Sequence, residues 1–179
     1  MAFEYLRYQE NMFYEITIIQ FSKMLKNLLQ ILDKAALEAE ARKFDVEVLV
    51  HSRLAPDQFT LLKQVQIACD TAKLCAARLT GKTAPVHDDS EKTLPELKSR
   101  ISQVITYLET YTKDDFSNSA EIKVSQPRWE GKYLTGFEFL VQHATPNFYF
   151  HLTTTYSILR HNGITLGKKD YLGEMPFKK

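Results

Sequence analysis

The sequence predicts an all-α protein, a four-helix bundle, and three observations support this prediction. Four segments space their apolar residues every three or four positions, as an amphipathic helix does, at about 17–42, 56–80, 93–111 and 136–163. Capping signals and glycines stand at the ends of several of these segments. The composition, with 44% hydrophobic and 25% charged residues, is that of an ordinary globular protein. A chain of 179 residues is most simply one domain, spanning 1–179.

The first helix is expected to begin at Thr17, because Thr17-Ile-Ile-Gln20 has the pattern of a capping box. Helical spacing then continues as far as Arg42, at Phe21, Leu25, Leu28, Leu32, Ala35 and Ala39. Residues 43–56 connect this helix to the next one. Within them, residues 45–50 fit either a helical turn or a strand, and the pattern does not decide between the two.

The second helix is expected to hold Pro56 near its first turn and to end at Gly81, which supplies a left-handed C′ residue. Cys69 and Cys75 both lie in this helix and point about 120° apart, so they cannot form a disulfide with each other. We interpret them as small core residues in a reduced, cytoplasmic protein. A second capping box, Thr93-Leu-Pro-Glu96, opens the third helix, whose apolar face holds Leu97, Ile101, Val104, Leu108 and Tyr111.

A short extended excursion is expected before the last helix, because residues 121–125 alternate in polarity and residues 129–134 can pair back with them. In the last helix, Pro146 produces either a kink or a restart with Thr145 as N-cap, and Gly163 ends the helix. An unbroken helix would have a core face made of Phe137, Leu140, Val141, Ala144, Phe148, Leu152, Thr155 and Leu159. The aromatic residues away from that face are Phe139, Tyr149, Phe150 and Tyr156. They predict either a lid formed by residues 114–134 or a subunit interface, and the interface would make the protein a homodimer.

The candidate site lies on this last helix. Asn147 and His151 are four residues apart at the edge of the core face, so both should project toward the bundle interior. His143 lies one turn earlier, but Pro146 intervenes and makes its alignment insecure. Imidazole is a common metal ligand, whereas an amide oxygen is a weak one. A hydrogen-bonded structural histidine is the alternative for each ring.

Several function classes find no support in the sequence. A net charge of +1 argues against nucleic acid as a partner, and no apolar run is long enough to span a membrane. The first ten residues lack the pattern of a secretory signal, which again favours the cytoplasm. Phosphate-binding glycine loops, Cys-x-x-Cys, His-Glu-x-x-His and Gly-x-Ser-x-Gly are all missing.

Four stretches of the chain carry a family resemblance: residues 54–57, 64–70, 146–151 and 158–163. Together with the spacing of His151, Arg160 and Gly163, they resemble the DinB/YfiT-like superfamily of bacterial bundle proteins, in a branch known only as a domain of unknown function. The resemblance covers about residues 12–173. It implies an up-down-down-up four-helix bundle that is often dimeric. It also implies a divalent metal bound by one histidine of the second helix and a His-x3-His pair of the last helix.

Carried over to this sequence, the metal pattern is incomplete. His151 matches the last ligand, but Asn147 stands where the preceding histidine should be, and Gln64 is the best match on the second helix. One imidazole and two amides would hold zinc or nickel weakly. His143 could add a nitrogen only if the helix turns it inward.

Three functions therefore stay open. The first is a binding or structural dimer that has lost its metal and has no cofactor. The second is a metal-dependent enzyme, similar to the thiol-dependent transferases of the superfamily, which uses His151 and His143, with Asp70 as a further candidate. The third is a pocket between the helices that binds a small molecule without metal. The residues do not decide whether the protein is an enzyme.

Overall fold

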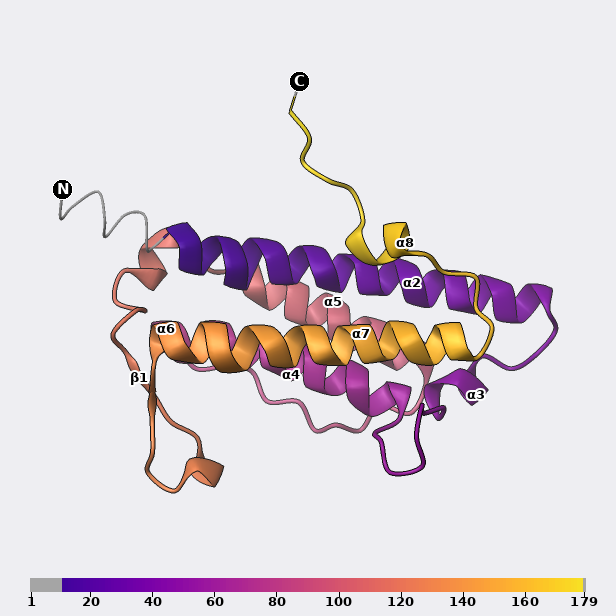
Figure 1. The fold of residues 1–179 in the computed structure, drawn as a ribbon, viewed down its shortest axis with the longest axis horizontal. Coiled ribbons are helices and arrows are strands. Elements are labelled where there is room, and N and C mark those ends of the chain that lie inside the picture. Colours follow the sequence, from indigo (N-terminus) through magenta and orange to yellow (C-terminus); the bar gives the residue numbers. More distant parts are fainter. Residues whose placement is uncertain (1–10, 179) are drawn as a thin grey trace.

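A computed structural model describes residues 11–178 and confirms the all-α bundle (Figure 1). The four long helices are α2 (Phe21–Ala41), α4 (Leu61–Thr80), α5 (Leu94–Leu108) and α7 (Thr145–His161). The short elements are α3 (Glu47–Val50), a two-stranded antiparallel sheet of β1 (Lys123–Val124) and β2 (Leu134–Thr135), α6 (Gly136–Glu138) and α8 (Lys168–Leu172).

Contacts between the helices show that they run up, down, down and up. α2 is parallel to α7 and antiparallel to α5, and α4 is antiparallel to α7. Gln20–Tyr149 and Arg42–Gly163 show that α2 and α7 are parallel. Lys26–Glu109 and Asp33–Lys98 show that α2 and α5 are antiparallel, and Gln64–His151 and Thr71–Asn147 show the same for α4 and α7. The pocket described below lies between α4 and α7.

Two expected helix starts are wrong. The first helix does not begin at Thr17, because α-helical residues 11–14 and a π-helical segment, η1 (Glu15–Gln20), precede α2 without a break. Thr17 is buried inside this helix, and the burial of Phe13 gives the extra turn a reason to form. The second helix begins at Leu61, so Pro56 belongs to the preceding loop rather than to its first turn.

Other local predictions are confirmed. Gly81 adopts a φ of +70° at the end of α4 and Gly163 a φ of +81° after α7. Thr93 caps α5, since its hydroxyl accepts from Glu96 N at 3.4 Å and its own N–H donates to Glu96 Oε2 at 2.9 Å. Residues 45–50 turn out to contain the short helix α3, and the excursion forms the β1–β2 hairpin. Tyr111 lies beyond the end of α5 but is buried as expected.

The last helix neither ends nor restarts at Pro146. Thr135 caps it, and it continues through α6, a second π-helical segment, η4 (Phe139–Ala144), and α7. Thr145 has helical backbone angles, so it is not an N-cap. A π turn is wider than an α turn, which separates the proline ring from the carbonyl four residues earlier.

This π-helical segment changes which residues face the core. Phe137 and Val141 were expected in the core, but each is 47% exposed, whereas Phe139 is 1% exposed. A π turn holds about one extra residue, so the positions before it rotate by roughly 100° relative to a regular helix. The remaining predicted core positions of α7, such as Phe148 and Leu152, are buried.

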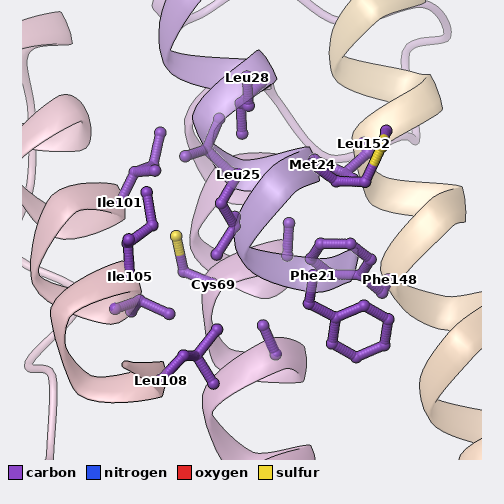
Figure 2. Packing of buried hydrophobic residues seen from close by; sticks show 14 of the residues in the cluster. Phe21, Met24, Leu25, Leu28, Cys69, Ile101, Ile105, Leu108, Phe148 and Leu152 are labelled. Carbon is purple, nitrogen blue, oxygen red and sulfur yellow. The ribbon is translucent and has the colours of Figure 1, made fainter. Parts of the chain in front are cut away.

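The core joins all four long helices (Figure 2). Phe21 of α2 stacks on Phe148 of α7 with ring centroids 4.2 Å apart. Cys69 and Cys75 are free and buried, and burial raises the pKa of both thiols to about 12. Within residues 11–178, no helix has both the length and the apolar character that a bilayer crossing requires.

Candidate functional site

A pocket of about 400 Å³ lies where α4 faces α7, and the β1–β2 hairpin closes one end of it. A volume of this size is within the range of small-molecule sites. All three predicted site residues of the last helix line it. Its lining residues are Phe59, Ile67, Asp70, Thr71, Leu74, Arg78, Gln126, Arg128, Phe139, His143, Asn147 and His151.

His151 is fixed by Gln64 from the opposite helix. Its Nδ1–H donates to Gln64 Oε1 at 2.6 Å, and Gln64 Nε2 donates to the carbonyl oxygen of Phe59 at 3.2 Å. The second bond orients the amide, so the amide oxygen faces the ring and Nδ1 must carry the proton. His151 Nε2 then keeps its lone pair and can accept a hydrogen bond.

Burial keeps this imidazole neutral. The side chain is almost enclosed, and desolvation lowers the pKa of His151 from 6.5 to about 4. Gln64 does not oppose protonation, because Nδ1–H donates in both charge states. At neutral pH the pocket therefore contains a hydrogen-bond acceptor here and not a positive charge.

Asn147 lies one turn before His151 and is oriented in a similar way. Its Nδ2 donates to Thr71 Oγ1 at 2.7 Å, and that hydroxyl donates to the carbonyl oxygen of Ile67 at 2.7 Å. The amide oxygen of Asn147 is left to accept from a ligand. α7 thus presents two acceptors, four residues apart, to one pocket.

His143 occupies the hairpin end of the pocket. Its Nε2 accepts from an Arg128 guanidinium nitrogen at 3.0 Å, so the proton is on Nδ1, which is buried and has no partner among residues 11–178. The ring stacks on Phe139 at 5.4 Å and meets Trp129 edge to face at 5.4 Å. Burial and the positive charges of Arg128 and Arg78 lower the pKa of His143. His143 is therefore engaged by the hairpin rather than turned toward Asn147.

The sequence interpretation named Asp70 but missed the two arginines of the pocket, Arg78 and Arg128. Arg78 lies near Arg128, and burial together with the charge of Arg128 lowers its pKa. Asp70 also lines the pocket, but its carboxylate pairs with Arg100 and Lys73 at 2.9 Å each. Arg100 could have been suspected, because it follows Leu97 by three positions on an amphipathic helix. The hairpin position of Arg128 has no comparable signal in the sequence.

The residues present do not fit a tightly bound zinc or nickel ion. The Gln64 oxygen is bound to the Nδ1 side of the His151 ring, which leaves His151 Nε2 and Asn147 Oδ1 as the atoms of these three residues that could bind a metal. One imidazole and one amide oxygen are too few and too weak for either ion. Among the residues that the structure describes, no group of three or more His, Cys, Asp or Glu side chains could hold a metal.

Comparison with known proteins assigns the family. Residues 13–172 match the family described as Domain of unknown function (DUF1993). A crystal structure of a DinB family member protein from Shewanella denitrificans is 62% identical to this chain, with a TM-score of 0.94, and the match covers 97% of this chain and 98% of that one. This chain is a DinB-like member of the DUF1993 family. No curated protein matches it.

The three positions that the resemblance matches to metal ligands lie on the facing helices α4 and α7. Gln64 of α4 lies against His151 of α7, and Asn147 lies one turn before His151. The amides at these two positions bind neighbouring polar groups of the chain itself. The arrangement is a pocket between α4 and α7 whose lining contains a fixed, neutral imidazole.

Proposed function

We propose that this DinB-like protein binds a small molecule between α4 and α7 and needs no metal ion to do so. The hydrogen bond from His151 Nδ1–H to Gln64 Oε1 at 2.6 Å carries the proposal. It fixes the ring so that Nε2 is left as an acceptor in the lining of the pocket. Asn147 Oδ1 adds a second acceptor, so hydroxyl, amide or amine groups of a ligand have partners.

Binding is better supported than catalysis. An imidazole with a pKa of about 4 is a weak base at neutral pH, far from the value that suits general base catalysis. Cys69 and Cys75 lie in the core with pKa values of about 12, so neither supplies a nucleophile to the pocket. The metal-dependent transferase, the alternative function, requires ligands that Gln64 and Asn147 replace with amides.

Protein purified without a histidine tag and treated with a chelator provides the test. Thermal unfolding is followed with a panel of small compounds that carry hydroxyl, amide or thiol groups. A ligand that binds only the folded state raises the melting temperature. We expect stabilisation by some members of the panel, and its loss in Asn147→Leu and His151→Leu variants. Near-stoichiometric zinc or nickel in untreated protein that disappears in His151→Ala would overturn the proposal in favour of the metal enzyme.

A homodimer remains a prediction of the family resemblance. The half-exposed Phe137 and Val141, together with Phe150 at 57% exposure, give the last helix apolar surface beyond what its own chain covers. Sedimentation velocity over a range of concentrations measures the mass directly. A Val141→Lys variant is expected to shift the equilibrium toward monomer, and a monomeric wild-type chain at all concentrations contradicts the prediction.

A further inference from the structure

The hairpin end of the pocket has more hydrogen-bond donors than acceptors. Arg78 has no ion-pair or hydrogen-bond partner among residues 11–178, and Arg128 has only the neutral His143. Gln126 Nε2 and His143 Nδ1 are buried in the lining without partners in the same part of the chain. A buried donor without an acceptor costs about 1–3 kcal/mol. Two of these donor groups are thus buried without an acceptor in the described chain, and the two guanidinium groups beside them bring positive charge that no carboxylate there pairs with.

No acidic side chain of the described residues neutralises the two arginines. Asp70, the acid in the pocket lining, belongs to a separate network in which Arg100 also binds Asp89 at 2.7 Å and Glu91 at 3.1 Å. The charges of that network, Lys63, Lys73 and Arg100 against Asp70, Asp89 and Glu91, balance each other. The excess positive charge therefore stays with Arg78 and Arg128.

Two like charges are held together by the way the chain folds around them. The guanidinium of Arg78 lies over the ring of Phe139, 5.9 Å from its centroid, and the π-helical segment η4 buries that ring. Arg128 belongs to a short helical turn of the hairpin, Pro127–Trp129, and Trp129 packs against Phe139 at 6.3 Å. The positive charge of Arg128 acts on Arg78, and a negative charge bound between the two guanidinium groups would interact favourably with both.

We propose that the pocket binds a small organic anion, with a carboxylate or phosphate group between Arg78 and Arg128 and a neutral hydrogen-bond donor group toward Asn147 and His151. This inference rests on the proposed function and specifies the class of ligand. Guanidinium groups bind both kinds of oxyanion through paired N–H donors. Asn147 and His151 follow His143 by four and eight residues, which is about 6 and 12 Å along a helix axis. The ligand therefore carries its hydroxyl or amide group several bonds away from the anionic group.

Matched probe compounds measure separately how the two ends of the pocket contribute to binding. Calorimetric titrations at low salt use inorganic phosphate and acetate, then glycerol 3-phosphate and 4-hydroxybutyrate, and finally the uncharged glycerol and 1,4-butanediol. We expect the hydroxylated anions to bind more tightly than the simple anions, and both to bind more tightly than the neutral compounds. The tighter of the two hydroxylated anions tells whether phosphate or carboxylate is preferred. Added salt is expected to weaken anion binding, because salt screens the attraction.

Arg78→Gln and Arg128→Gln are each expected to weaken the binding of the preferred anion by about tenfold or more, the effect of removing one charged hydrogen-bonding group. Lys132→Gln is the control, because it removes the same charge from an exposed site on the same hairpin outside the pocket. Arg128 is exposed, so its variant is expected to fold even if that of Arg78 does not.

The outcomes of these titrations test the anion site separately from the metal-free binding of a small molecule. The anion site is overturned if the neutral compounds bind as tightly as the anions, or if the Arg128→Gln variant binds the anions with wild-type affinity. Either result leaves the proposal of a metal-free pocket intact. A wild-type protein that binds neither the anions nor any compound of the broader panel overturns both.

Discussion

The neutral state of His151 predicts a specific loss of stability in acid. The folded pKa is about 4 and the ordinary value is 6.5, so between these values the unfolded chain binds more protons than the folded one. Stability therefore falls as the pH is lowered through this window. For this one group the loss is about 2 kcal/mol at pH 5 and about 3 kcal/mol at pH 4, since each pKa unit corresponds to about 1.4 kcal/mol.

Urea unfolding followed by far-ultraviolet circular dichroism measures this loss. The informative quantity is the free energy of unfolding of wild type minus that of His151→Gln, at each pH from 7 to 4, because the other titrating groups cancel in the difference. We expect this difference to fall by about 3 kcal/mol over the range. The same substitution at the exposed His161 serves as a matched control on α7 and should not reproduce the effect. Wild-type and His151→Gln curves that stay parallel within about 0.5 kcal/mol would refute the buried, neutral imidazole.

Three further predictions concern side chains that the structure places in fixed surroundings. Gln64→Leu leaves the Nδ1–H of His151 without its acceptor, so unfolding in urea should show a loss of about 1–3 kcal/mol; an unchanged midpoint argues against the bond. Arg100→Met leaves three carboxylates without their shared cation and should cost about 3 kcal/mol at pH 7. The cost should shrink in acid, as the pH falls through the lowered pKa values of Asp89 and Glu91 and their charges are lost. Cys69 and Cys75 should not react with Ellman's reagent in native protein and both should react in denaturant, because burial raises their pKa to about 12 and blocks access. Fast labelling of either thiol under native conditions contradicts the packing.

Regular periodicity predicted most of the fold, because burying one face of a helix leaves a clear three- and four-residue signal. The Thr93 capping box and the left-handed Gly81 are local signals of the same kind, and both are confirmed. Thr17 shows the limit of local reasoning. The capping pattern is present, but the buried Phe13 favours continuing the helix, and that contact depends on the tertiary structure.

The candidate site could be predicted only in part. The four-residue spacing predicted that Asn147 and His151 project to the same side of the helix, and both line the pocket. The family resemblance matched Gln64 to a position on the second helix, and Gln64 binds His151 in the structure. Arg78 and Arg128 could not be paired from the sequence, because one belongs to a bundle helix and the other to a hairpin whose path depends on packing. Fifty residues separate them along the chain.

The π-helical segment makes the core face predicted from helical periodicity wrong at Phe137 and Val141, and it also forms one end of the pocket. If residues 139–144 were α-helical, Phe139 would rotate by roughly 100° away from the core, as an unbroken helix predicted. The ring beneath Arg78 and beside His143 would then be missing, and Trp129 would lose the surface on which the hairpin packs. Pro146 lies two residues after the end of the segment, and its ring favours the wider turn. One proline thus links the helix geometry to the placement of Arg128. It also explains why the pocket lies at the point where the last helix is least regular.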